Sequence, residues 1–154
     1  WQDPRDPAAG VVIRIADGIN VGFAVNGPQG LVVPVIKNAQ DKSLAAISRE
    51  EKLLTDKARS NRLTLDDLED QTIGLSNLGA YDIDSFVGIV PPLVSAILAA
   101  GKVNPAAVPQ DGRVAVRKMM SLTLSVDHRV IDSEYAARFL QFLTEQLNDP
   151  GRLI

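Results

Sequence analysis

The pattern of apolar and polar residues changes its period at His128, near the C-terminal end of the chain. Over residues 122–126, aliphatic residues alternate with polar ones, which is the period of two of a strand. Over residues 133–148, apolar residues recur at helical spacing, and Asp132 is placed to cap that helix. The pattern predicts that His128 lies in a loop between a strand and a helix, where rigid scaffolds often present working residues.

The rest of the chain predicts short strands around one further helix. That helix begins after Ser43, whose hydroxyl can cap it, and ends near residue 60, with one apolar and one charged side. A dense turn signal over residues 26–30 joins two strands rich in Val and Ile, and Pro34 places the second at a sheet edge or a bulge. The predicted strands and helices do not alternate strictly along the chain, as they would in a doubly wound sheet. The pattern therefore predicts an α/β fold of the α+β type. The predicted strands are Val11–Ala16, Ile19–Val25, Leu31–Ile36, Gln71–Asn77, Phe86–Val90, Val94–Ala100 and Arg113–Val126, with a loop over Pro105–Gly112.

Composition restricts the chemistry that remains. The 154 residues suggest one domain, with 45% hydrophobic and 23% charged residues, as in ordinary globular proteins. A net charge of −3 without a basic stripe argues against nucleic acid as a partner, and no apolar run is long enough to span a membrane. The absence of cysteine excludes disulfides and thiol catalysis, and a single histidine argues against a metal site. Because the chain starts with Trp1, we interpret it as a piece of something longer.

Two positions are candidates for chemistry. His128, four residues before Asp132, could act as a general base at neutral pH, while the carboxylate organises the turn. The alternative is a surface or hydrogen-bonded histidine beside an ordinary helix-capping aspartate. Ser76 ends a predicted strand and could donate its hydroxyl to a developing oxyanion, although Ser76-Asn77 and the following glycine could simply shape a turn.

The segment Asp127-His128-Arg129-Val130-Ile131-Asp132 resembles the DHRxxDG signature of the dihydrolipoamide acyltransferases, the E2 cores of 2-oxo acid dehydrogenase complexes. Four other stretches agree with that family in order and spacing, so that the resemblance covers nearly the whole chain. They are Asn20–Val25, Gly30–Ile36, Leu75–Gly79 and Ala96–Gly101.

The resemblance implies a chloramphenicol-acetyltransferase-like mixed sheet with flanking helices, and a catalytic domain over residues 1–154 that lacks its N-terminal part. Lipoyl and peripheral-subunit-binding domains would lie upstream. Two departures from the family pattern stand out: Ser133 replaces the glycine that closes the signature, and Leu93 follows Pro91-Pro92 where Glu or Gln is common. In relatives, the aspartate matching Asp132 pairs with an arginine from the earlier region.

The resemblance further implies transfer of an acyl group between S-acyl-dihydrolipoamide and coenzyme A, with the pyruvate or branched-chain type of complex favoured. His128 would be the base, Ser76 the oxyanion donor, Asp132 an architectural residue and Asn77 a contact for coenzyme A, with no metal. Family members form homotrimers with active sites between subunits, and the trimers build a cubic or dodecahedral core. E1 decarboxylase and E3 dihydrolipoamide dehydrogenase would bind through upstream domains, in the bacterial cytoplasm or the mitochondrial matrix.

Two other interpretations remain. The chain could be a catalytically silent core that only scaffolds partner subunits, or a stand-alone acetyltransferase with a hydroxyl acceptor. A third signal, Asp56-Lys57-Ala58, resembles a lipoyl attachment site, but it falls inside a predicted helix rather than on a tight turn. We therefore interpret Lys57 as a solvated surface charge.

Overall fold

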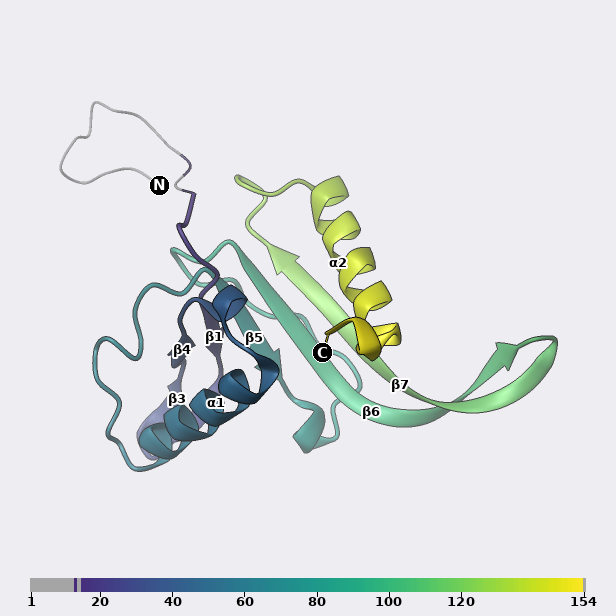
Figure 1. The fold of residues 1–154 in the computed structure, drawn as a ribbon. Helices are drawn as coiled ribbons and strands as arrows, with labels where there is room; N and C mark the ends of the chain where they lie inside the picture. Colours follow the sequence, from purple (N-terminus) through teal and green to yellow (C-terminus); the bar gives the residue numbers. More distant parts are fainter. Residues whose placement is uncertain (1–12, 14, 154) are drawn as a thin grey trace.

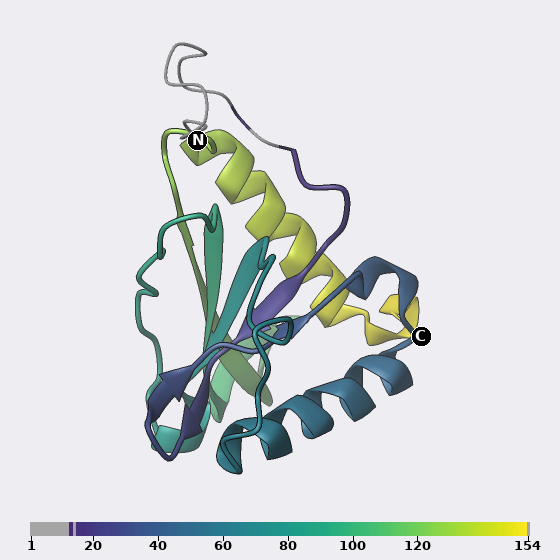
Figure 2. The same ribbon diagram turned by 90° about the vertical axis from the view of Figure 1, so that its left-hand side faces the viewer.

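The computed structural model describes residue 13 and residues 15–153. Most of its strands form one mixed sheet of five strands in the order β4-β1-β5-β6-β7, with β5 parallel to both β1 and β6 and the outer pairs antiparallel. Strands β2 and β3 form a separate hairpin. Figure 2 shows both long helices on the same face of the sheet. The elements are β1 (Val21–Phe23), β2 (Val25–Gly27), β3 (Gly30–Val32), β4 (Val35–Ile36), α1 (Leu44–Arg59), β5 (Ile73–Asn77), β6 (Ala96–Gln110), β7 (Arg113–Val126) and α2 (Ser133–Asn148), with short 3-10 helices at Ala39–Asp41, Gly79–Tyr81 and Pro150–Leu153.

One part of the buried core lies in the N-terminal half, and the other lies at Val94 and the start of β6. Helix α1 is capped by Ser43, whose Oγ accepts from the N–H of Ala46 at 3.3 Å, and the helix packs against β2 and β4. Phe23 and Ile36 from the sheet and Leu54 from α1 form the buried cluster. Pro34 interrupts the predicted strand, so that β3 lies in the hairpin and β4 at the edge of the large sheet.

The C-terminal half is built on a long antiparallel pair. Strands β6 and β7 leave the body of the domain and continue as a curved two-stranded ribbon, here called the arm, which comprises residues 103–120 (Figure 1). The register shifts between Ala100 and Val103, which marks a bulge where the arm begins. Asp111-Gly112 make the tight turn at its tip.

Several predicted boundaries were confirmed and others were wrong. The predictions of β7 and α2 were confirmed to the residue, and Lys57 does lie on a helix. The loop predicted over Pro105–Gly112 was wrong, because both prolines of that stretch lie in β6. In a two-stranded ribbon each strand has one free edge, and a proline whose nitrogen faces that edge loses no ladder hydrogen bond. Half of the strand predicted over Val11–Ala16 lies outside the described residues, and its described residues, Ile13, Ile15 and Ala16, belong to no strand.

The strand predicted over Phe86–Val90 was also wrong, since this segment joins no ladder. Its neighbour β6 already pairs with β5 on one side and β7 on the other. The segment instead crosses the sheet face, where Gly88 lies so close to Ile97 that an added Cβ would be 2.5 Å from the Ile97 side chain. None of the helices in the described part of the chain combines the length and apolarity that crossing a membrane requires.

Candidate active site at the end of β7

His128 lies in a tight turn directly after β7. The N–H groups of Val130 and Ile131 both bind the backbone oxygen of Asp127 at 3.0 Å, and the Asp127 N–H binds the oxygen of Ser95 on the segment before β6. These bonds tie the backbone on both sides of His128 to the sheet. The predicted position of the histidine between a strand and a helix was therefore correct.

Asp132 caps the helix that follows. Its Oδ1 accepts from the N–H of Tyr135 at 2.7 Å, and its backbone is extended, as expected of an N-cap residue. The carboxylate therefore organises the helix start, which agrees with the architectural role that the sequence suggested.

An ion pair inside the same motif neighbours the histidine. Arg129 Nε donates to both carboxylate oxygens of Asp127, at 2.9 and 3.2 Å, and Nη2 donates at 2.6 Å. The side-chain and backbone hydrogen bonds from Arg129 lower the pKa of the Asp127 carboxyl to about 2. The carboxylate is therefore charged at neutral pH and fixes the turn that carries His128.

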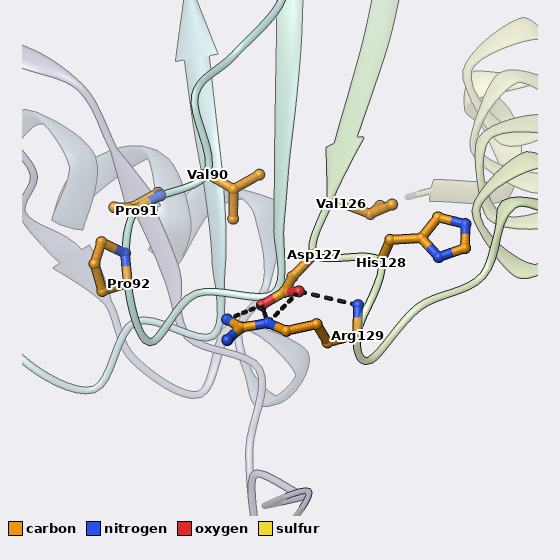
Figure 3. A pocket seen from close by; sticks show the side chains of 7 residues that line it. All are labelled: Val90, Pro91, Pro92, Val126, Asp127, His128 and Arg129. Atoms are coloured by element: carbon orange, nitrogen blue, oxygen red, sulfur yellow. Dashed lines mark hydrogen bonds and ion pairs between the residues drawn. The ribbon is translucent and has the colours of Figure 1, made fainter. Parts of the chain in front are cut away.

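An open hollow of about 550 Å³ lies beside these residues (Figure 3). Its polar side comes from Asp127, His128 and Arg129, and its apolar side from Val126 and the segment 90–92. This proline-containing wall was not predicted from the sequence, because it lies more than thirty residues before His128 in the chain. The imidazole points away from Pro91 and Pro92 and toward the start of α2.

Ser76 lies elsewhere in the same chain. The register places it opposite Ala99 on β6, which in turn faces Thr123 on β7. The three residues from Thr123 to the end of β7 alone span about 10 Å, and His128 lies beyond that end. One chain therefore does not bring Ser76 and His128 together.

Asn77 follows Ser76 but faces the other side of the sheet, as alternation along a strand requires. Its Oδ1 accepts from the N–H of Gly79 at 2.8 Å, and it lines a second, mainly apolar hollow of about 340 Å³ beneath α1. Glu51 is the charged residue of that lining. Asn77 and Ser76 thus belong to different faces, a distinction that the shared sequence motif did not reveal.

The interpretation of Lys57 as a solvated charge was wrong. Its Nζ binds both carboxylate oxygens of Asp67 at 2.9 and 3.1 Å, and the Asp67 side chain is 12% exposed. Burial raises the pKa of Asp67, but hydrogen bonds from Thr64 and Lys57 together outweigh it and leave this pKa below its ordinary value. Lys57 therefore joins α1 to the turn before β5.

Comparison with known proteins agrees with this architecture. Residues 7–154 match the family described as 2-oxoacid dehydrogenases acyltransferase (catalytic domain). The chain is 40% identical to component 5 of the chloroplastic pyruvate dehydrogenase complex of Arabidopsis thaliana, a dihydrolipoyllysine-residue acetyltransferase, over 88% of the chain and 29% of the relative. Other relatives are named as succinyltransferase components of 2-oxoglutarate dehydrogenase complexes. The chain thus spans about a third of the length of the curated relatives that it matches.

Two solved structures superpose closely on the fold. One is the dihydrolipoamide acetyltransferase of Azotobacter vinelandii, whose structure was solved to study the role of a serine, a histidine and an asparagine in its catalytic mechanism. The other is the cubic core of the pyruvate dehydrogenase multienzyme complex. Each has a TM-score of 0.87 and 38% identity, over 96% of this chain and 60% of the other. The chain belongs to the acyltransferase catalytic-domain family of the 2-oxoacid dehydrogenases.

Proposed function

We propose that this chain transfers an acyl group between S-acyl-dihydrolipoamide and coenzyme A, with His128 as base and Ser76 as oxyanion donor. The spacing of the site residues carries this proposal. In the Azotobacter vinelandii enzyme, the catalytic serine precedes the histidine by 52 positions and the asparagine follows it by four. Ser76, His128 and Asp132 have the same separations, and aspartate and asparagine are both strong helix caps.

The chemistry begins with the thiol of coenzyme A. A thiol with a pKa of about 8.5 is mostly protonated at neutral pH, so a base that removes its proton generates the nucleophile. His128 takes this proton while the sulfur attacks the carbonyl carbon of the acyl-dihydrolipoyl thioester. The tetrahedral oxyanion accepts a hydrogen bond from Ser76. When the intermediate collapses, the bond to the dihydrolipoyl sulfur breaks and His128 returns a proton to that sulfur. Asn77 remains assigned to contact with coenzyme A.

A complete site requires a second copy of the chain, because Ser76 and His128 lie at opposite ends of the sheet. Ser76 lies near the C-terminal end of β5, and His128 follows the C-terminal end of β7. These two ends point in opposite directions, because β5 runs parallel to β6 and β7 runs antiparallel to it. The base of one subunit would then act beside the serine of its neighbour. Such a site is supported by the similarity to a multienzyme core. We propose a homotrimer that builds a cubic or dodecahedral core, with E1 and E3 bound through other domains.

The arm supports such an assembly. Directly opposed residues of an antiparallel pair share one face, and this face of the arm is apolar apart from one lysine. A ribbon of two strands has little stability of its own in water, so an apolar face on it favours burial against another surface. The face consists of Val103, Pro105, Ala107, Pro109, Val114, Val116, Lys118 and Met120.

The test is acyl transfer by the intact protein and its His128→Ala variant, offered S-acetyl-, S-succinyl- and S-isobutyryl-dihydrolipoamide with coenzyme A. We expect the variant to lose a factor of about 10² to 10⁴, as for loss of a general base. Ser76→Ala should lose about 10² to 10³. Sedimentation should show the same assembly in all three proteins. A correctly assembled wild type without activity would instead favour the silent scaffold, and equal activity in wild type and His128→Ala would exclude His128 as the base.

A further inference from the structure

Ser133 contacts the proposed base directly. Its Oγ lies 3.2 Å from Nε2 of His128, five residues earlier in the chain. The imidazole is turned toward the start of α2, where Ser133 is the first helical residue, and away from the wall of Pro91 and Pro92 (Figure 3). The family signature has glycine at this position, so the hydroxyl is a feature of this chain.

The backbone on each side of this contact is fixed. Ser133 follows Asp132, whose carboxylate caps α2 and whose backbone oxygen accepts from Ala136 at 3.1 Å. His128 sits in the turn closed on the Asp127 oxygen. Only the side-chain torsions of His128 and Ser133 remain to be set, and a hydrogen bond to one ring nitrogen sets both the ring orientation and the tautomer.

We propose that Ser133 is a positioning residue that holds His128 ready for the reaction. The inference rests on the proposed function. The Ser133 hydroxyl donates to the lone pair of Nε2, which leaves the ring proton on Nδ1 and keeps Nε2 unprotonated. Nε2 is the ring nitrogen farther from the backbone and thus the one that reaches an incoming thiol. The thiol of coenzyme A then takes the place of the Ser133 hydroxyl beside Nε2. The hydroxyl keeps its proton, and the thiol gives its proton to Nε2.

The tautomer can be measured without activity. His128 is the single histidine of these 154 residues, and the ring signals that disappear in His128→Ala identify it in the spectrum of protein labelled with nitrogen-15 histidine. The wild type should show mainly the Nδ1–H tautomer, whereas Ser133→Ala should shift toward Nε2–H, the form that free imidazole prefers. Ser133→Thr keeps a hydroxyl and should resemble the wild type. Ser48→Ala removes a hydroxyl from the exposed side of α1 and should change nothing. The same tautomer in wild type and Ser133→Ala would overturn the inference.

Kinetics give the second readout. Ser133→Ala should lower kcat for acyl transfer by about 2- to 10-fold, the worth of one ordinary hydrogen bond, and leave the KM for coenzyme A unchanged. Ser133→Thr should restore kcat. Should wild type lack transfer activity while the tautomer still depends on Ser133, the proposed function fails and the contact stands. Should His128→Ala abolish transfer while Ser133→Ala changes neither tautomer nor kcat, the function stands and the inference fails.

Discussion

The two halves of the molecule differ in how many of their apolar side chains are buried. In the N-terminal half, Phe23, Ile36 and Leu54 are buried against one another between α1 and the sheet. In the C-terminal half, the buried apolar residues are confined to Val94 and the start of β6, and none of the sixteen residues of α2, all of them described, is buried. Phe142 on α2 is 59% exposed, and Val116 on the arm is 73% exposed.

This contrast separates a packed half, in which α1 covers a core within one chain, from a presenting half, in which the arm and α2 expose apolar side chains. An exposed apolar face on a ribbon or helix marks a place where another surface packs. The proposed base lies at the junction of β7 and α2, inside the presenting half, whereas Ser76 lies on a strand of the packed half. Changes in the packed half should therefore unfold the domain, and changes in the presenting half should affect assembly and chemistry.

The largest effect is expected on the arm. The double variant Val114→Lys/Val116→Lys places charge on its apolar face and should prevent assembly while each chain stays folded. Activity should fall by about 10² or more, since each base loses the oxyanion donor of its neighbour. Sedimentation and circular dichroism check the two parts. The control is Ala115→Lys, which lies between the two valines on the opposite face of the arm. Retained assembly in the double variant would show that this face is not an interface.

Two adjacent leucines of α1 test the packed half. Leu54 is 4% exposed and Leu53 is 57% exposed. Leu54→Ala should lower the free energy of unfolding by about 2 to 5 kcal/mol, because it leaves a cavity in the core. Leu53→Ala should change it by less than about 0.5 kcal/mol. Denaturant unfolding measures both, and equal losses would mean that the core does not lie where the structure places it.

The ion pair between α1 and the following turn should have a smaller, pH-dependent effect. Asp67→Asn removes the charge that accepts from Lys57 and from the N–H and hydroxyl of Thr64, and should cost about 1 to 2 kcal/mol. Since the folded-state pKa of Asp67 lies below 3.8, its contribution is fully present above about pH 4 and is lost as the pH falls through that lower pKa. Unfolding curves of the two proteins should converge in acid. Asp66→Asn, at a neighbouring 86% exposed carboxylate, is the control and should cost little.

The smallest effect concerns the turn that carries His128. Arg129→Gln should raise the pKa of Asp127 from about 2 toward the ordinary 3.8, because the guanidinium hydrogen bonds are lost. The Asp127 contribution to stability is present above pH 3.8 and is lost as the pH falls through 2, so the variant should lose it at higher pH. Because Arg129 is exposed, stability at neutral pH should hardly change. A carboxyl-carbon NMR titration of both proteins measures the shift directly, and an unchanged pKa would refute the assigned cause.

Sequence patterns predicted the elements whose signals are local. Helix α2 and strand β7 have clear periods and explicit caps or turns at their ends, and their predicted bounds match the structure. The cap at Ser43 and the turn over residues 26–30 depend on neighbouring residues only, and both were confirmed. The same local reading also placed His128 at the junction of a strand and a helix.

The predictions that depended on pairing partners were the ones that failed. Residues 86–90 have strand-like composition, but both edges of the neighbouring part of β6 are occupied, by β5 and β7. Pro105 fits β6 because β5 no longer pairs with β6 along the arm, which leaves that edge of β6 free. The chain alone thus specified where its two long helices begin and which residues are candidates for chemistry. The tertiary structure decided that Ser76 and His128 stand at opposite ends of the sheet, that Lys57 is paired and that Ser133 reaches the imidazole, since these relations join positions whose distance depends on strand order and register.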